Sequence, residues 1–129
     1  MSKYAGVAVL SNNNILLARR IEFYKGNIVP YGGYWSVFVG AIEEGESPED
    51  TAERELFVEA KITIENPLVF VDMIDDFSLF ATEFDNMIYP ELNFEHTEYG
   101  WFKIDSLKSF PYQIDEKIVN LILKYKKIV

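Results

Sequence analysis

The chain has 129 residues, a formal net charge of −9 at pH 7 and no cysteine. That length predicts a single domain over residues 1–129, large enough to bury a hydrophobic core. The lack of cysteine excludes disulfide bonds and cysteine-based zinc sites, so a bound metal would need oxygen ligands. The acidic surface argues against non-specific nucleic-acid binding, and no apolar run is long enough to cross a membrane. Because the N-terminus lacks a signal-peptide pattern, we expect a cytoplasmic protein.

The first third of the sequence predicts short strands joined by turns. A strand at residues 5–10 and its hairpin partner at 15–19 flank the polar turn at 11–14. Residues 21–34 contain a proline and three glycines and are predicted to form a loop. A short strand at 35–39 follows this loop and ends at a glycine.

The clearest helix start comes after that strand. Ser47 is an N-cap residue by type, Pro48 suits the first helical position, and Asp50 lies three residues after the cap. Ala52 and Leu56 give this helix an apolar stripe. The predicted helix lies in the most acidic part of the chain, because eight acids stand against one base between residues 40 and 59.

The second half of the chain predicts more strands and a last helix. Strand-like segments occur at residues 68–71, 79–84 and around 100–104. An amphipathic helix begins at about Asp115 and carries apolar residues on one face. Strands, one central helix, further strands and a final helix predict a mixed α/β (α+β) sandwich.

Two carboxylates on the central helix suggest chemistry. Glu55 and Glu59 are four residues apart, so they project from one helix face about 5–6 Å apart at Cβ. Such a pair repels itself unless a cation lies between the two groups, and Mg²⁺ is a natural partner because it takes oxygen ligands. The alternative is an ordinary solvated acidic face with Arg54 as its local counter-charge.

The residues around this pair follow a known pattern. Gly40, Glu46, Arg54-Glu55-Leu56, Glu59 and Ile62 have the spacing of the Nudix box, G-x5-E-x7-R-E-U-x-E-E-x-G-U, in which U is a bulky apolar residue. Segments 16–20 and 33–37 also look like strands of that family, and segment 95–102 looks like the one that often brings a further acid to its metal site. The sequence therefore resembles the Nudix hydrolases over nearly all of its length. This resemblance implies a Nudix-type sandwich, in which a mixed sheet lies between helices.

The resemblance also implies metal ligands and structural residues. Glu55, Glu59, Glu95 and the backbone carbonyl of Val39 would hold Mg²⁺ or Mn²⁺. The remaining fixed positions of the motif, Gly40, Glu46 and Arg54, would be structural. Glu46 and Arg54 would pair and so hold the loop to the helix.

Further residues are assigned to catalysis and substrate binding. The resemblance leaves the base that takes a proton from water open among Glu59, Glu95, Glu98 and His96. Arg20 is a candidate phosphate contact, with a solvated strand end as the alternative. Trp35 is a candidate for stacking on a nucleobase, with ordinary packing as the alternative.

The implied activity is metal-dependent hydrolysis of a nucleoside diphosphate linked to another moiety. Three departures bear on it, because Val58 replaces an acid of the box, Lys61 replaces its glycine, and Phe38-Val39 replaces the usual Pro-Gly. The alternatives are a catalytically weakened nucleotide-binding module and a sugar-nucleotide hydrolase that uses His96 as base. The expected partner is a small nucleoside diphosphate derivative, and the sequence leaves the oligomeric state open, with a homodimer among the possibilities.

Overall fold

The computed structural model describes residues 2–128, with side chains through residue 126. Its nine strands and two α-helices follow one another along the chain, with a 3-10 helix before the last helix. They are β1 (Tyr4–Ser11), β2 (Asn14–Arg20), β3 (Phe23–Tyr24), β4 (Asn27–Ile28), β5 (Trp35–Ser36), β6 (Phe38–Ala41), α1 (Pro48–Ala60), β7 (Val69–Ile74), β8 (Phe77–Glu83), β9 (His96–Lys103), η1 (Ile104–Ser109) and α2 (Glu116–Ile128).

The predicted N-terminal hairpin is present and turns at two asparagines. Asn12 and Asn13 both have positive φ angles, of 46° and 67°. Two-residue hairpin turns with positive φ at both central positions match the right-handed twist of the flanking strands. The polar turn and the apolar runs beside it thus carried enough local information to predict β1 and β2.

Seven strands form one mixed sheet around β1. Strand β8 runs parallel to β1 along most of its length, and β7 pairs with the outer side of β8. On its other side β1 pairs first with β6, through Tyr4–Val7, and then with β2 near the hairpin turn. Segment β5–β6 therefore fills the space where β1 and β2 diverge, while β9 pairs with the outer side of β2.

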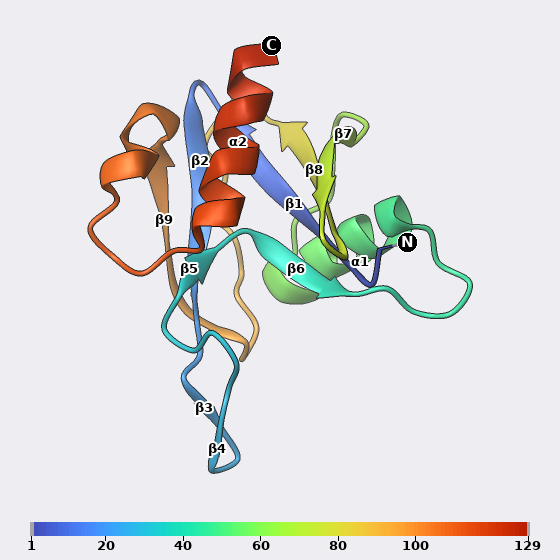
Figure 1. The fold of residues 1–129 in the computed structure, drawn as a ribbon, viewed down its shortest axis with the longest axis vertical. Helices are drawn as coiled ribbons and strands as arrows, with labels where there is room; N and C mark the ends of the chain where they lie inside the picture. The colour runs from blue at the N-terminus through green and yellow to red at the C-terminus, as the bar shows by residue number, and fades with distance from the viewer. Residues whose placement is uncertain (1, 129) are drawn as a thin grey trace.

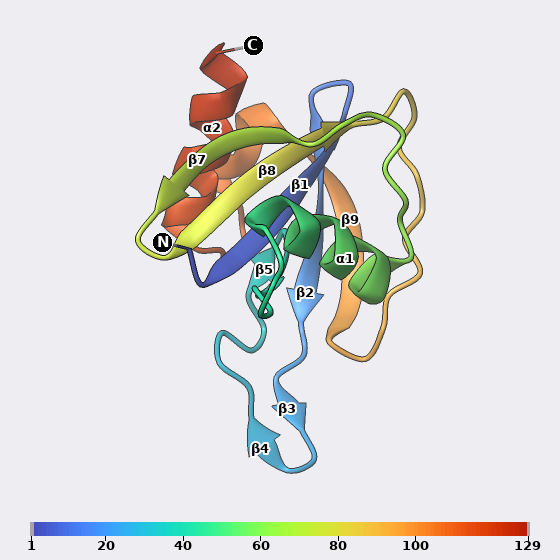
Figure 2. The ribbon, with the colours of Figure 1, turned by 90° about the vertical axis from the view of Figure 1, so that its right-hand side faces the viewer.

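The two α-helices cover opposite faces of this sheet, as Figures 1 and 2 show together. Alternate residues of β1 belong to different cores: Ala8 and Leu10 pack on the α2 side, and Val7 and Val9 on the α1 side. Because both faces are buried, this strand appears in the sequence as a continuous apolar run. The arrangement confirms the predicted mixed sheet between helices. No helix among residues 2–128 is long and apolar enough to cross a bilayer.

Three segments differ from the prediction. The strand expected at residues 35–39 is divided into β5 and β6, and β6 continues through Gly40 to Ala41. The expected loop at residues 21–34 contains the small hairpin β3–β4, which turns at Lys25 and Gly26 and projects beyond the sheet (Figure 2). The strand expected around residues 100–104 begins earlier, at His96, and η1 replaces its expected end. His96 is thus the first residue of a strand.

Candidate active site

Helix α1 begins with a reciprocal cap. The Asp50 amide donates to Oγ of Ser47 at 3.1 Å, and the Ser47 amide donates to Oδ2 of Asp50 at 3.4 Å. With Pro48 at the first helical position, these contacts satisfy backbone groups that the helix itself leaves free. The cap fixes the helix start and so the face from which Glu55 and Glu59 project.

An ion pair joins the loop before α1 to the helix. Arg54 donates to both carboxylate oxygens of Glu46, from Nε at 2.7 Å and from Nη2 at 2.9 Å. Glu46 also accepts from the Thr51 hydroxyl at 2.8 Å, and Arg54 also donates to the Ala41 carbonyl at 3.2 Å. The hydrogen bond from Arg54 is the largest cause that lowers the pKa of Glu46 to about 2. The structure thus contains the predicted pair, with the bidentate geometry that favours strong binding.

The side chain of Glu55 occupies the space beside Gly40, so a residue with a side chain would not fit at that position. A Cβ atom at Gly40 would lie 2.3 Å from both Cγ and Cδ of Glu55, which is far inside van der Waals contact. Arg54 donates from Nη1 to Oε1 of Glu55 at 2.5 Å. Glu55 is therefore held against β6, next to the Val39–Gly40 backbone that the resemblance implicates in metal binding.

Three carboxylates converge at this point. Glu55, Glu59 and Glu95 each offer an oxygen, and these oxygens lie within 4.8 Å of one another. The Glu59 side chain is 1% exposed, and burial, a hydrogen bond to Glu55 and the charges of Glu95 and Glu55 raise its pKa to about 10. Its Oε2 atom is buried without a hydrogen-bond partner among the described residues.

This arrangement fits a divalent cation. Negative charges this close together are costly without a positive group between them. A buried oxygen without a hydrogen-bond partner has a lone pair that can bind a ligand. An all-carboxylate set suits hard cations such as Mg²⁺ and Mn²⁺.

Glu95 reaches the cluster through a loop that is tied to α1. Asn93 donates to Oε2 of Glu95 at 3.0 Å, and its own side-chain oxygen accepts from the Glu95 amide at 2.9 Å. The Asn93 amide in turn donates to the carbonyl of Glu59 at 3.0 Å. Asn93 was not predicted from the sequence, although an asparagine side chain often hydrogen-bonds the backbone two residues further on.

His96 and Arg20 lie behind the cluster, opposite each other on β9 and β2. The His96 side chain is 3% exposed, and its Nε2 atom is 3.8 Å from Oε1 of Glu59. Burial and the nearby charge of Arg20 lower the pKa of His96 to about 4, so its imidazole is neutral at pH 7. Arg20 is half-buried, and its charge also acts on Glu59.

Two candidate residues lie elsewhere. Glu98 is exposed and pairs in register with Arg19, which itself pairs with Trp35 on the α2 side of the sheet. Trp35 is 5% exposed, stacks on Tyr112 and packs edge-to-face on Phe102. The structure therefore brings neither Glu98 nor Trp35 into the carboxylate cluster.

The two departures on α1 have different surroundings. Val58 is 41% exposed, so it is not a core residue. Lys61 follows the helix end with φ 56° and ψ 31°, the left-handed conformation for which the family pattern has glycine.

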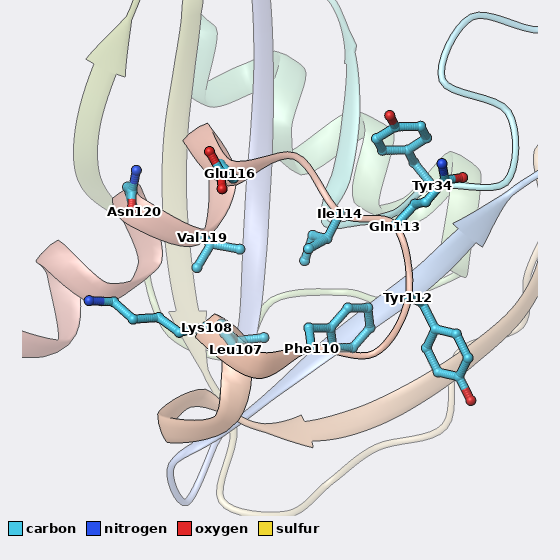
Figure 3. Close-up of a pocket in the computed structure, with 10 residues that line it drawn as sticks. All are labelled: Tyr34, Leu107, Lys108, Phe110, Tyr112, Gln113, Ile114, Glu116, Val119 and Asn120. Atoms are coloured by element: carbon cyan, nitrogen blue, oxygen red, sulfur yellow. The ribbon is translucent and has the colours of Figure 1, made fainter.

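A cavity of about 520 Å³ lies on the other face of the sheet, between η1 and α2. Figure 3 shows its lining, which includes Tyr34, Phe110, Tyr112, Lys108 and Asn120. None of the three clustered carboxylates lines it. The carboxylate chemistry therefore points to the α1 side, whereas this cavity is on the α2 side.

Comparison with known proteins identifies the family. A family model described as the NUDIX domain matches residues 2–122. The chain belongs to the NUDIX family. The box at residues 40–62 is thus the loop and helix that carry Gly40, Glu55 and Glu59. None of the curated proteins matches the sequence.

Solved structures of NUDIX proteins share the fold at low identity. A MutT protein of Methanosarcina mazei is 19% identical with a TM-score of 0.70, covering 97% of this chain and 92% of its own. An Ap4A hydrolase of C. elegans, solved as a binary complex, is 20% identical with a TM-score of 0.71 and coverages of 98% and 97%. The NUDIX domain of Shewanella oneidensis NrtR, solved with ADP-ribose, is 16% identical with a TM-score of 0.71 and coverages of 99% and 88%.

Proposed function

We propose that this NUDIX protein hydrolyses the diphosphate linkage of a nucleoside diphosphate derivative with the help of Mg²⁺ or Mn²⁺. The observation that carries the proposal is the cluster of Glu55, Glu59 and Glu95, whose oxygens lie within 4.8 Å of one another. The Ap4A and ADP-ribose named for two structural neighbours support the same substrate class. We further propose that the protein acts in the cytoplasm on a small molecule.

Some of the chain's own residues would serve as cation ligands, and Glu95 would also take part in the reaction. Glu55, Glu59, Glu95 and the Val39 carbonyl would hold the cation. When bound, a divalent cation offsets negative charge on the phosphate oxygens and makes water a better nucleophile. Water attacks one phosphorus atom, and the bond from that atom to the bridging oxygen breaks. Arg20, half-buried beside the cluster, would bind a phosphate oxygen.

Glu95 is the best placed group to accept the proton from the attacking water. It is partly exposed and held by Asn93, whereas Glu59 is almost fully buried. A general base must come within hydrogen-bonding reach of the water molecule. His96 meets this requirement poorly because its ring is enclosed, and so the sugar-nucleotide alternative with a histidine base is less well supported.

A nucleotide-binding module with weak or no turnover is the second candidate. It is favoured by Val58, an exposed residue on α1 at a position where the box has an acid. One fewer carboxylate reduces the charge available for a cation cluster.

A panel of substrates distinguishes the hydrolase from the nucleotide-binding module. Purified protein is incubated with nucleoside triphosphates, ADP-ribose, dinucleoside polyphosphates, sugar nucleotides and capped RNA, with Mg²⁺, Mn²⁺ or EDTA. We expect turnover of at least one compound with a metal and none with EDTA. If folded protein hydrolyses nothing while a compound raises its melting temperature, the binding module is the correct interpretation.

A further inference from the structure

The ring of His96 is enclosed by its neighbours in the fold. It is the first residue of β9, and it pairs in register with Arg20 of β2. Phe38 of β6 packs against the imidazole at 77° between ring planes and 5.4 Å between centroids. The side chain is 3% exposed, so the ring has little freedom and little contact with water.

This ring faces Glu59. The Nε2 atom of His96 lies 3.8 Å from Oε1 of Glu59, while Oε2 of the same carboxyl has no partner among the described residues. The Nδ1 atom of His96 is also buried without a partner there. Oε1 of Glu59 therefore lies towards the imidazole, and Oε2 is left without a partner, within the described part of the chain, in a carboxyl group that belongs to the cluster with Glu55 and Glu95.

We propose that His96 is a positioning residue that donates Nε2–H to Oε1 of Glu59 and thereby aims Oε2 at the bound cation. The inference rests on the proposed function, since it assigns a role within the same site. The N···O distance exceeds an ordinary hydrogen bond by roughly 0.9 Å, a gap that a small turn of the Glu59 side chain covers. A ligating carboxylate held by a second hydrogen bond keeps its geometry, and loss of such a partner weakens metal binding about 10- to 100-fold.

The chemistry of the ring agrees with this role. A neutral imidazole carries one ring proton, which it can donate from Nε2 while Nδ1 stays bare. A positioning residue, unlike a base, does not need to reach water.

The first test is Mn²⁺ binding, measured by electron paramagnetic resonance without substrate. His96→Gln keeps an N–H donor at a similar reach, whereas His96→Phe keeps the ring and removes the donor. We expect His96→Phe to bind Mn²⁺ about 10- to 100-fold more weakly and His96→Gln to stay within a few-fold of wild type. Unchanged affinity in His96→Phe, or equal loss in both variants, would overturn the inference. Wild-type protein that binds no Mn²⁺ would instead overturn the proposed function.

A second measurement needs no variant that must fold. His96 is the only histidine, so its ring nitrogens give one set of signals in a nitrogen-15 correlation spectrum of the whole protein. We expect the proton on Nε2 and a bare Nδ1. A proton on Nδ1 would contradict the proposal, because Nε2 then has nothing to donate.

A third measurement combines two variants. If His96 acts through Glu59, then in a Glu59→Gln background the change His96→Phe should weaken Mn²⁺ binding no further.

Discussion

Lys61 occupies the left-handed position at the end of α1, with its amide donating to the Phe57 carbonyl at 2.9 Å. A side chain at positive φ is strained where glycine is not, so Lys61→Gly should raise the free energy of unfolding by about 1 kcal/mol. Urea denaturation without metal measures it. Lys61→Ala is the control, because it also removes the contact of Lys61 Nζ with the Phe57 ring. A glycine variant no more stable than the alanine variant would show that the turn is unstrained.

Val58 is exposed, so a glutamate there stays solvated and avoids the cost of burial. It lies three residues after Glu55 and next to Glu59, near the face that carries the proposed metal site. Val58→Glu should therefore tighten Mn²⁺ binding and leave the melting temperature unchanged. Phe57→Glu adds the same charge on another face of the helix and should not tighten binding. A lower melting temperature together with weaker binding would mean that Val58 has a packing role.

Individual residues show how far the sequence could be interpreted. The spacing of Glu55 and Glu59 was enough to predict a shared face, because it depends only on helix geometry. The sequence could not show whether Glu95 or Glu98 joins the metal site, because β9 has a register shift opposite Arg19 and Arg20. Such a bulge changes which residues share a face of the sheet. Trp35 was likewise ambiguous, since nothing local indicates that distant rings enclose it.

At the scale of elements, the ion pair between the box loop and α1 should control acid stability. The pKa of Glu46 is lowered from 4.5 to about 2 in the folded protein, chiefly by Arg54. Between these values the unfolded chain binds more protons, so this contribution is complete above about pH 4.5 and lost as the pH falls to about 2. Glu46→Gln should therefore melt below wild type at pH 7, and the difference should shrink to nothing near pH 2.

Melting curves from pH 2 to 7 test this, with Glu44→Gln as the control because Glu44 is exposed nearby. A wild-type advantage that stays constant with pH would mean that the Glu46 carboxylate is not the cause.

Elements with strong local signals, such as the capped start of α1, were predictable from sequence. The early start of β9 was not, because its pairing with β2 depends on residues some eighty positions away.

At the scale of the whole molecule, the site depends on how the sheet divides. Strands β1 and β2 diverge, β6 fills part of the gap, and Gly40 comes to lie beneath Glu55 of α1. The loop before β9 then brings Glu95 to the same point. The motif indicates the positions of Gly40 and Glu55 because these residues are close in sequence. The position of Glu95 depends on the folded topology, which the family resemblance suggested and residue patterns alone did not.

The most direct test of the account is the effect of Glu59→Gln on metal-dependent turnover of the best substrate from the panel. The change keeps the shape of the buried side chain and removes the carboxylate that would bind the cation. We expect turnover to fall by about 100-fold or more, with folding retained and Mn²⁺ bound more weakly. The matched control is Glu53→Gln, an exposed position on the same helix, which should leave both quantities unchanged. Turnover by Glu59→Gln at the wild-type rate would contradict the proposed metal site.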